Sequence, residues 1–314
     1  MDPGTGRRHG GTVATVTESP HSSSTVPASP PQAATSGGRP PDGDVPAAPI
    51  RALPGEGVDG LAVALSGRVL RVTLNRPDQR NSLTWAMIDG LRRIFVEVRG
   101  DDRVGAVVLT GAGDRAFSAG ADLSGMTGGS ALAMHEARGQ LPALFEAMWA
   151  AGTPTVASVR GYCLAGGMGL ALACDLVVAA DDAVFGTPEI NVGLWPYVIT
   201  VPLLRSMPPK RALELMMTGR RIDAAEADRF GFLARTVPVE ELEATTDELA
   251  AGLSRAPSGV MALGRDSFYR AVDATAADAL SHLQAMLSLG SSLDDAAEGT
   301  TAFLEKRQPN WSGS

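Results

Sequence analysis

The sequence predicts an α/β fold with a helical C-terminal region, and three observations lead to this prediction. Between residues 61 and 180, short apolar runs typical of buried strands alternate with segments whose apolar residues recur at helical spacing. Two Gly-rich loops, at 116–123 and 161–170, each follow an apolar strand. From about Pro202 onward the pattern is almost wholly helical. Repeated alternation of strand and helix favours a layered fold with crossover connections, capped by the C-terminal helices.

Composition narrows the class of protein. With 314 residues, 44% of them hydrophobic and 20% charged, the chain can bury a sizeable core. A net charge of -8 provides no field for holding a nucleic acid. The most apolar stretch, 170–180, is too short for a membrane span and is interrupted by Asp175. We therefore expect a cytoplasmic globular protein that binds neither nucleic acid nor membrane.

Cys163 and Cys174 lie among small and aliphatic residues, which is typical of reduced, buried thiols rather than of a disulfide or a metal framework.

The chain divides into three predicted segments. Residues 1–57 contain ten of the 21 prolines and no Phe, Trp or Tyr, so they cannot bury enough apolar surface to offset the entropy cost of ordering. We expect a disordered tail there, an α/β core over 58–201, and a helical region over 202–314 that serves oligomerisation and coenzyme contact.

The elements of the core follow in order. Two short strands, 61–65 and 69–75, form a hairpin around Gly67. A helix starts at Ser82 or Thr84 as its cap and stops at Gly100. The remaining core elements are a strand at 105–110, a Gly- and Ala-rich loop at 111–130, a helix at 131–150, strands at 155–159 and 176–180, and a short helix from near Gly166 between them. The C-terminal helices are expected near 209–218, 223–229, 239–254, 258–271, 276–289 and 293–306.

The two Gly-rich loops, AFSAGADL (116–123) and GYCLAGGMGL (161–170), let backbone N–H groups approach a ligand closely. The second loop also opens a helix, so its N–H groups combine with the positive end of the helix dipole. A group that is anionic, or becomes anionic, suits this place. Neither loop matches a nucleotide-binding fingerprint.

Two other chemistries have little support. The string at 116–120 partly resembles the nucleophile elbow of a serine hydrolase, but Ala116 replaces its first Gly, and only His135 and His282 lie outside the tail as bases. No His, Cys or Asp cluster has the spacing of metal ligands, so we expect no metal site.

Five separated stretches resemble the crotonase superfamily of enoyl-CoA hydratases and isomerases, in that family's order. They are LNRPDQRNSL (74–83), AFSAGADL (116–123), GYCLAGGMG (161–169), FGTPEINVGLWP (185–196) and AFLEKRQPNW (302–311). The resemblance implies a crotonase-like spiral of repeated β-β-α units. It also implies an acyl-CoA substrate, no cofactor beyond the coenzyme A of that substrate, and a homotrimer or a dimer of trimers in which the helical region packs against neighbours.

The same resemblance assigns roles at the reacting centre. The backbone N–H groups of Ala121 and Gly166 match the oxyanion hole that holds a thioester enolate. Hydratases of the family carry one glutamate three residues beyond the second oxyanion glycine and another twenty residues further on. Here those positions are Gly169 and Glu189, so the first acid is missing and the second is present.

One carboxylate suffices to move a double bond, whereas hydration is served by two. The sequence therefore favours an enoyl-CoA isomerase that works through Glu189. Several alternatives stay open. One is a hydratase in which Tyr197, Asp122 or His135 replaces the missing acid, and another is a catalytically weak member that binds CoA thioesters or acts as an assembly partner. Because the family's fold hosts many reactions, a decarboxylase, a thioesterase or a biosynthetic enolate reaction also stays open.

Further positions match the family's substrate contacts. Trp195 and Tyr197 are expected to form the wall of the acyl pocket. The positions that match coenzyme A contacts are Asp78, Gln79, Arg80, Ala119, Phe303 and Lys306. Position 78 is commonly basic in the family and is acidic here.

Overall fold

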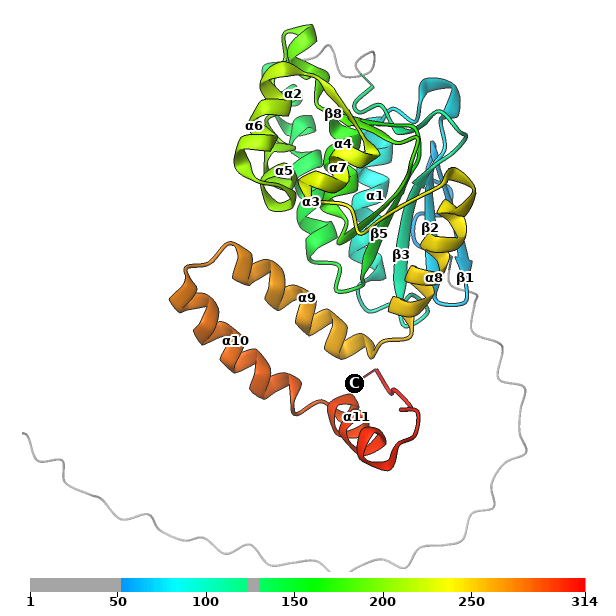
Figure 1. The fold of residues 1–314 in the computed structure, drawn as a ribbon, viewed down its shortest axis with the longest axis vertical. Coiled ribbons are helices and arrows are strands. Elements are labelled where there is room, and N and C mark those ends of the chain that lie inside the picture. Colours follow the sequence, from blue (N-terminus) through cyan, green and yellow to red (C-terminus); the bar gives the residue numbers. More distant parts are fainter. Residues whose placement is uncertain (1–51, 123–129, 314) are drawn as a thin grey trace, which may run out of the picture. The chain divides into compact units, whose positions relative to one another are not determined.

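The computed structural model describes residues 52–122 and 130–313 (Figure 1), which belong to one unit, Ile50–Ser314. Its strands are β1 (Leu61–Ser66), β2 (Val69–Leu74), β3 (Ala106–Gly111), β4 (Ala116–Ser118), β5 (Thr155–Val159), β6 (Tyr162–Leu164), β7 (Leu176–Ala180), β8 (Val184–Gly186), β9 (Arg221–Asp223) and β10 (Arg235–Val237). The predicted disordered tail lies mostly outside the described residues. Of its last positions, Gly55 is described and packs against Ile94.

The helices alternate with these strands and then follow one another. The α-helices are α1 (Trp85–Val98), α2 (Ala131–Arg138), α3 (Gln140–Trp149), α4 (Gly166–Ala173), α5 (Thr200–Ser206), α6 (Pro209–Thr218), α7 (Ala224–Phe230), α8 (Leu242–Ser254), α9 (Ser258–Val272), α10 (Ala276–Gly290) and α11 (Asp294–Glu305). Three short 3-10 helices are η1 (Pro77–Gln79), η2 (Pro188–Val192) and η3 (Val239–Glu241).

The strands form two sheets, and from β3 to β8 successive strands alternate between them. The larger sheet has the order β1-β2-β3-β5-β7-β10, and the smaller has the order β4-β6-β8-β9. The pairs β3 with β4, β5 with β6 and β7 with β8 each place one strand in each sheet, with helices between successive pairs. This is the predicted spiral of β-β-α units. It brings the segments that follow β4, β6 and β8 to neighbouring places, because these three strands run parallel to one another.

The central strands of the large sheet, β3, β5 and β7, are buried on both faces, which explains their almost continuously apolar sequences. In β3, Val107 and Leu109 belong to the main core with α1, α3 and α4, whereas Ala106 and Val108 face a smaller core beneath α8. Side chains alternate between the two faces of a strand, so a buried strand needs apolar residues at every position.

Several predicted elements are confirmed. The hairpin forms with β1 and β2 antiparallel, and α1 begins after Thr84, whose hydroxyl accepts a hydrogen bond from the Met87 amide. The two cysteines are free and buried, and burial raises the pKa of both thiols.

No helix in the described residues is long and apolar enough to cross a membrane.

Other predictions were wrong in detail. The helix expected at 131–150 is two helices, because the chain is interrupted at Gly139. β4 and β6 lie inside segments that we expected to be loops, and β9 and β10 interrupt the region expected to be almost wholly helical. These strands have only three residues each, so periodicity cannot reveal them. They form because the fold brings hydrogen-bonding partner strands beside them.

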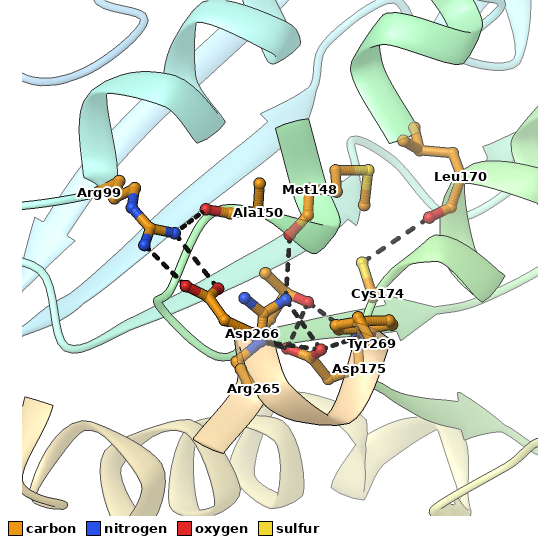
Figure 2. A network of polar contacts seen from close by, with 10 residues as sticks. Arg99, Met148, Ala150, Leu170, Cys174, Asp175, Arg265, Asp266 and Tyr269 are labelled. Atoms are coloured by element: carbon orange, nitrogen blue, oxygen red, sulfur yellow. Dashed lines mark hydrogen bonds and ion pairs between the residues drawn. The ribbon is translucent and has the colours of Figure 1, made fainter. Parts of the chain in front are cut away.

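A buried polar network joins α9 to the core (Figure 2). Arg265 on α9 donates from Nε to both carboxylate oxygens of Asp175, at 3.0 and 2.9 Å, and from Nη2 to the Met148 carbonyl at 3.0 Å. The Tyr269 hydroxyl and the Thr155 amide also donate to Asp175, each at 2.7 Å. Burial, followed by the nearby Asp175 charge, raises the pKa of the Tyr269 hydroxyl. Asp175, the residue that precedes β7, thus connects α9 with the start of β5.

Candidate active site

The two Gly-rich segments meet where β4 and β6 end. Leu83 connects the first segment to the chain before α1: its amide donates to the Gly120 carbonyl at 2.8 Å, and its carbonyl accepts from the Asp122 amide at 2.9 Å. A Cβ at Gly120 would lie only 2.7 Å from the Ala165 Cβ and 3.1 Å from the Gly166 nitrogen. Gly120 has a φ of +96°, so glycine is needed here both for the backbone conformation and for the close approach of the second segment.

This contact places two backbone amides side by side. Gly166 is the first residue of α4, where amides have no partner within the helix. A Cβ built on Gly166 would lie 3.8 Å from the Ala121 nitrogen. Neither the Ala121 nor the Gly166 amide donates a hydrogen bond to any residue that the structure describes. The pair, with the helix dipole behind it, is arranged to stabilise an oxygen that gains negative charge.

The residue before α4 holds a strained conformation. Ala165 has φ of 52° and ψ of −130°, a region that residues with a Cβ seldom occupy. Its amide donates to the Gly186 carbonyl at 2.9 Å, and the Gly169 amide donates back to its carbonyl at 3.1 Å. These bonds fix the turn that points the first α4 amides toward the Ala121 segment.

A buried polar cluster of Asn81 and Ser118 supports the Ala121 segment. The sequence did not predict a role for these two residues. Asn81 is fully buried and donates from its amide group to the carbonyls of Ala112 and Ala116, at 2.9 and 2.7 Å. The Ser118 hydroxyl donates to the Asn81 carbonyl at 2.8 Å. Asn81 has a φ of +53°, which asparagine tolerates better than most residues. The sequence feature that could have indicated this cluster is the position of Asn81 inside the first motif, next to the predicted start of a helix.

Asp122, a candidate acid, forms an ion pair instead. Arg76 Nη1 donates to Asp122 Oδ2 at 2.8 Å and to the Ser82 carbonyl, also at 2.8 Å. Arg76 therefore ties the segment after Ala121 to the chain before α1. Of the other substitutes considered for the missing acid, His135 is exposed in the last turn of α2, and Tyr197 is 77% exposed.

Glu189 lies in η2, the short helix that follows β8. Its Oε2 atom is buried and has no hydrogen-bond partner among the described residues, and the same holds for Thr187 Oγ1. Burial raises the pKa of the Glu189 carboxyl, and its own backbone amide offsets part of this rise. A carboxylate that is desolvated but not paired is suited to take up and release a proton.

The position of the missing acid is occupied by neighbouring hydrocarbon. A Cβ at Gly169 would lie 2.3 Å from Ile199 Cγ2, 2.8 Å from Ile199 Cβ and 3.3 Å from Phe145 Cζ. Ile199 and Phe145 are themselves buried. The sequence showed that the carboxylate is absent, and the structure adds that position 169 has no room for any side chain.

The remaining predicted site residues differ in where the structure places them relative to the Gly-rich segments. Asp78, Gln79 and Arg80 are exposed around η1, and the Arg80 carbonyl accepts from the Ala119 amide at 2.9 Å, which holds this loop beside the Ala121 segment. Trp195 is half-buried against the main core. Phe303 and Lys306 are exposed at the end of α11, a helix that packs on α9, and the structure does not bring them to the Gly-rich segments.

The described residues contain no group of three or more His, Cys, Asp or Glu side chains that could hold a metal ion.

Comparison with known sequences gives a consistent result. Residues 65–314 match the model of a family described as enoyl-CoA hydratase/isomerase. The chain is 36% identical over 249 residues to a probable enoyl-CoA hydratase of Mycobacterium leprae, covering 78% of this chain and 94% of the relative. It is 35% identical over 260 residues to a carnitinyl-CoA dehydratase of Citrobacter koseri, covering 79% of this chain and 96% of that protein.

Solved structures agree with these relatives. An enoyl-CoA hydratase of Mycobacterium smegmatis superposes with a TM-score of 0.77 at 32% identity, covering 80% of this chain and 98% of that one. An enoyl-CoA hydratase from Bacillus anthracis superposes with the same TM-score of 0.77 at 31% identity, covering 81% and 100% of the two chains. The residues that match the family model, 65–314, include the segments that carry Ala121, Gly166 and Glu189.

Proposed function

Because the chain belongs to the enoyl-CoA hydratase/isomerase family of the crotonase superfamily, we propose that it moves a double bond in an enoyl-CoA thioester through an enolate, with Glu189 as the proton carrier. The observation that carries this proposal has two parts: Glu189 Oε2 is buried without a hydrogen-bond partner among the described residues, and position 169 has no space for a second carboxylate.

The two amides of Ala121 and Gly166 bind the thioester carbonyl oxygen. As Glu189 takes a proton from C2 of a 3-enoyl thioester, the electrons of that C–H bond shift toward the carbonyl and the oxygen gains negative charge. Donors that are already oriented stabilise this charge in the transition state more than in the bound substrate, each by about 3 kcal/mol.

The second half of the reaction returns the proton. Glu189, now protonated, gives its proton to C4, and the double bond comes to rest between C2 and C3 in conjugation with the thioester. The buried Oε2 and the raised pKa support this role, since the carboxyl must hold the proton while the enolate exists.

Hydration is the second candidate, favoured by the names of the relatives, which include probable enoyl-CoA hydratases. Adding water to a 2-enoyl thioester requires a group that activates the water at C3 and a group that protonates C2. In this chain, Asp122 is paired with Arg76, and His135 and Tyr197 are exposed. These placements support isomerisation over hydration.

The test is to supply the purified protein with a 3-enoyl-CoA and, separately, with a 2-enoyl-CoA in deuterated buffer. Double-bond position and deuterium content are followed by NMR and mass spectrometry. We expect the 3-enoyl-CoA to become the 2-enoyl-CoA with little 3-hydroxyacyl product. Rapid formation of 3-hydroxyacyl-CoA would instead establish a hydratase with a non-standard second group. No turnover and no exchange with either thioester would point instead to another acyl-CoA reaction or to a CoA-binding role.

For the assembly, we propose a homotrimer or a dimer of trimers in which α9, α10 and α11 pack against neighbouring subunits. Their exposed apolar side chains support this, including Leu280 (69% exposed), Leu287 (71%) and Phe303 (82%). These helices also line an apolar groove of about 860 Å³. In such an assembly, Phe303 and Lys306 would contact the coenzyme A of a neighbouring subunit. Light scattering at micromolar concentration should give three or six times the chain mass of 32.4 kDa, and a monomer would contradict the proposal.

A further inference from the structure

Position 169 lies on the catalytic side of α4. Gly166, which supplies an oxyanion amide, and Gly169 are three residues apart in this helix, so they lie on the same face, one turn apart. A side chain at 169 would therefore begin on the face of α4 that carries Gly166. In this protein the three atoms nearest to such a side chain all belong to Ile199 and Phe145, and all three are carbon.

Ile199 is held firmly in this place. It is the residue before α5, it is only 3% exposed, and its carbonyl accepts a hydrogen bond from the Leu203 amide at 3.1 Å. The atoms nearest to Gly169 are its Cβ and Cγ2, which cannot move away without a change of χ1 or of the backbone. A β-branched side chain is stiff at χ1, so Ile199 cannot give way as the end of a flexible chain would.

The segment that carries Glu189 also carries Ile199. Turns connect the two residues, with the Leu194 amide bonded to the Glu189 carbonyl at 3.0 Å and the Thr200 amide bonded to the Tyr197 carbonyl at 3.2 Å. One connecting segment therefore provides the carboxylate and fills the space in which a second carboxylate would stand.

We propose that Ile199 is a specificity-determining residue that keeps the reaction to proton transfer by filling, together with Phe145, the space of a water-activating side chain at position 169. This inference rests on the proposed isomerase function and deepens it. Gly169 and Ile199 form a coupled pair. Ile199 leaves space only for glycine at position 169, and its apolar side chain fills the space that an acidic side chain at 169 would need.

The proposal predicts that restoring the acid alone fails. In Gly169→Glu the new side chain collides with Ile199 and its carboxylate is forced among hydrocarbon without a partner, which is unfavourable for a charged group. In Gly169→Glu combined with Ile199→Ala, the truncation opens space at the point of collision. A positioned acid or base contributes a factor of about 10²–10⁴, so even an imperfectly placed Glu should raise hydration at least tenfold.

The experiment compares the wild type, both single variants and the double variant. Each protein receives a 2-enoyl-CoA and a 3-enoyl-CoA, and NMR measures the ratio of hydration rate to isomerisation rate. We expect the ratio to rise at least about tenfold in the double variant and to stay near the wild-type value in Gly169→Glu. The matched control combines Gly169→Glu with Leu203→Ala, a buried truncation one turn further along α5, and it should not raise the ratio.

A stability measurement tests the coupling without any activity. Gly169→Ala should lower the melting temperature of the wild type, and the same substitution should lower it much less in the Ile199→Ala background, because the added Cβ then has space. Equal decreases in both backgrounds would overturn the packing argument.

Failure of this proposal is distinguishable from failure of the proposed function. If the wild type isomerises 3-enoyl-CoA but Gly169→Glu hydrates as fast as the double variant, Ile199 has no role in specificity while the isomerase function stands. If the double variant hydrates no faster than the wild type, the inference about Ile199 is also wrong. If the wild type itself hydrates rapidly, the isomerase function fails, and with it the premise of the inference.

Discussion

Glu189→Gln should lower the turnover of 3-enoyl-CoA by about 10³-fold, within the range that a positioned acid–base group contributes. Glutamine keeps the size and polarity of the side chain but cannot accept the C2 proton, so the enolate does not form at a useful rate. Binding of the thioester should change little, because the two amides that bind its oxygen are on other segments. Steady-state kinetics and calorimetric binding of a saturated acyl-CoA measure the two effects separately.

The control is Glu97→Gln, which removes an exposed carboxylate on α1 and should leave turnover as in the wild type. If Glu189→Gln turns over at the wild-type rate, Glu189 does not carry the proton and the proposed mechanism is wrong. Loss of both binding and turnover would point to a structural role of this side chain.

The same variant has an expected effect on stability with a definite sign. Burial raises the pKa of Glu189 above its ordinary value of 4.5, so the native state binds this proton more tightly than the unfolded chain does. Above the raised pKa, the ionised group therefore costs native stability, and this cost disappears as the pH falls below the ordinary value. Glu189→Gln should melt at a higher temperature than the wild type at pH 8 and at nearly the same temperature near pH 4.

The acid limb of the wild-type pH–rate profile should correspondingly lie above the range of an ordinary glutamate.

The second large effect concerns the attachment of α9. Arg265→Met should lower the free energy of unfolding by about 3 kcal/mol, because Asp175 would keep a buried negative charge without its cationic partner. Arg265 is only 8% exposed, and it also satisfies the Met148 carbonyl (Figure 2). For a chain of this size, this corresponds to a decrease of roughly 6–12 °C in melting temperature.

Arg160→Met is the matched control, since Arg160 pairs with Asp182 at 3.1 Å and both side chains are well exposed. Exposed pairs contribute about 0–1 kcal/mol, so this variant should melt close to the wild type. Both variants must be compared at one protein concentration, because assembly raises apparent stability. Equal melting temperatures for the two variants would show that the Asp175 network does not hold α9.

The sequence alone determined the order of most elements, the position of both Gly-rich segments and the loss of the acid at Gly169. These features are local: Thr84 caps α1 through its own hydroxyl, and the apolar run at 176–180 can only be a buried strand in this context. The resemblance to the family's motifs then predicted Ala121, Gly166 and Glu189 as the reacting groups, since each of these motifs is a short stretch of consecutive residues.

Only the tertiary structure decided what surrounds these groups. β10 pairs with β7, which lies more than fifty positions earlier in the chain. A strand of three residues is too short for its hydrophobic pattern to predict this pairing. Likewise, Ile199 meets Gly169 across the contact of α4 with the residue that precedes α5. The sequence near each residue does not predict either contact, because each depends on which distant segments the fold brings within van der Waals distance. The sequence therefore shows that a carboxylate is missing, and the fold shows that hydrocarbon has taken its place.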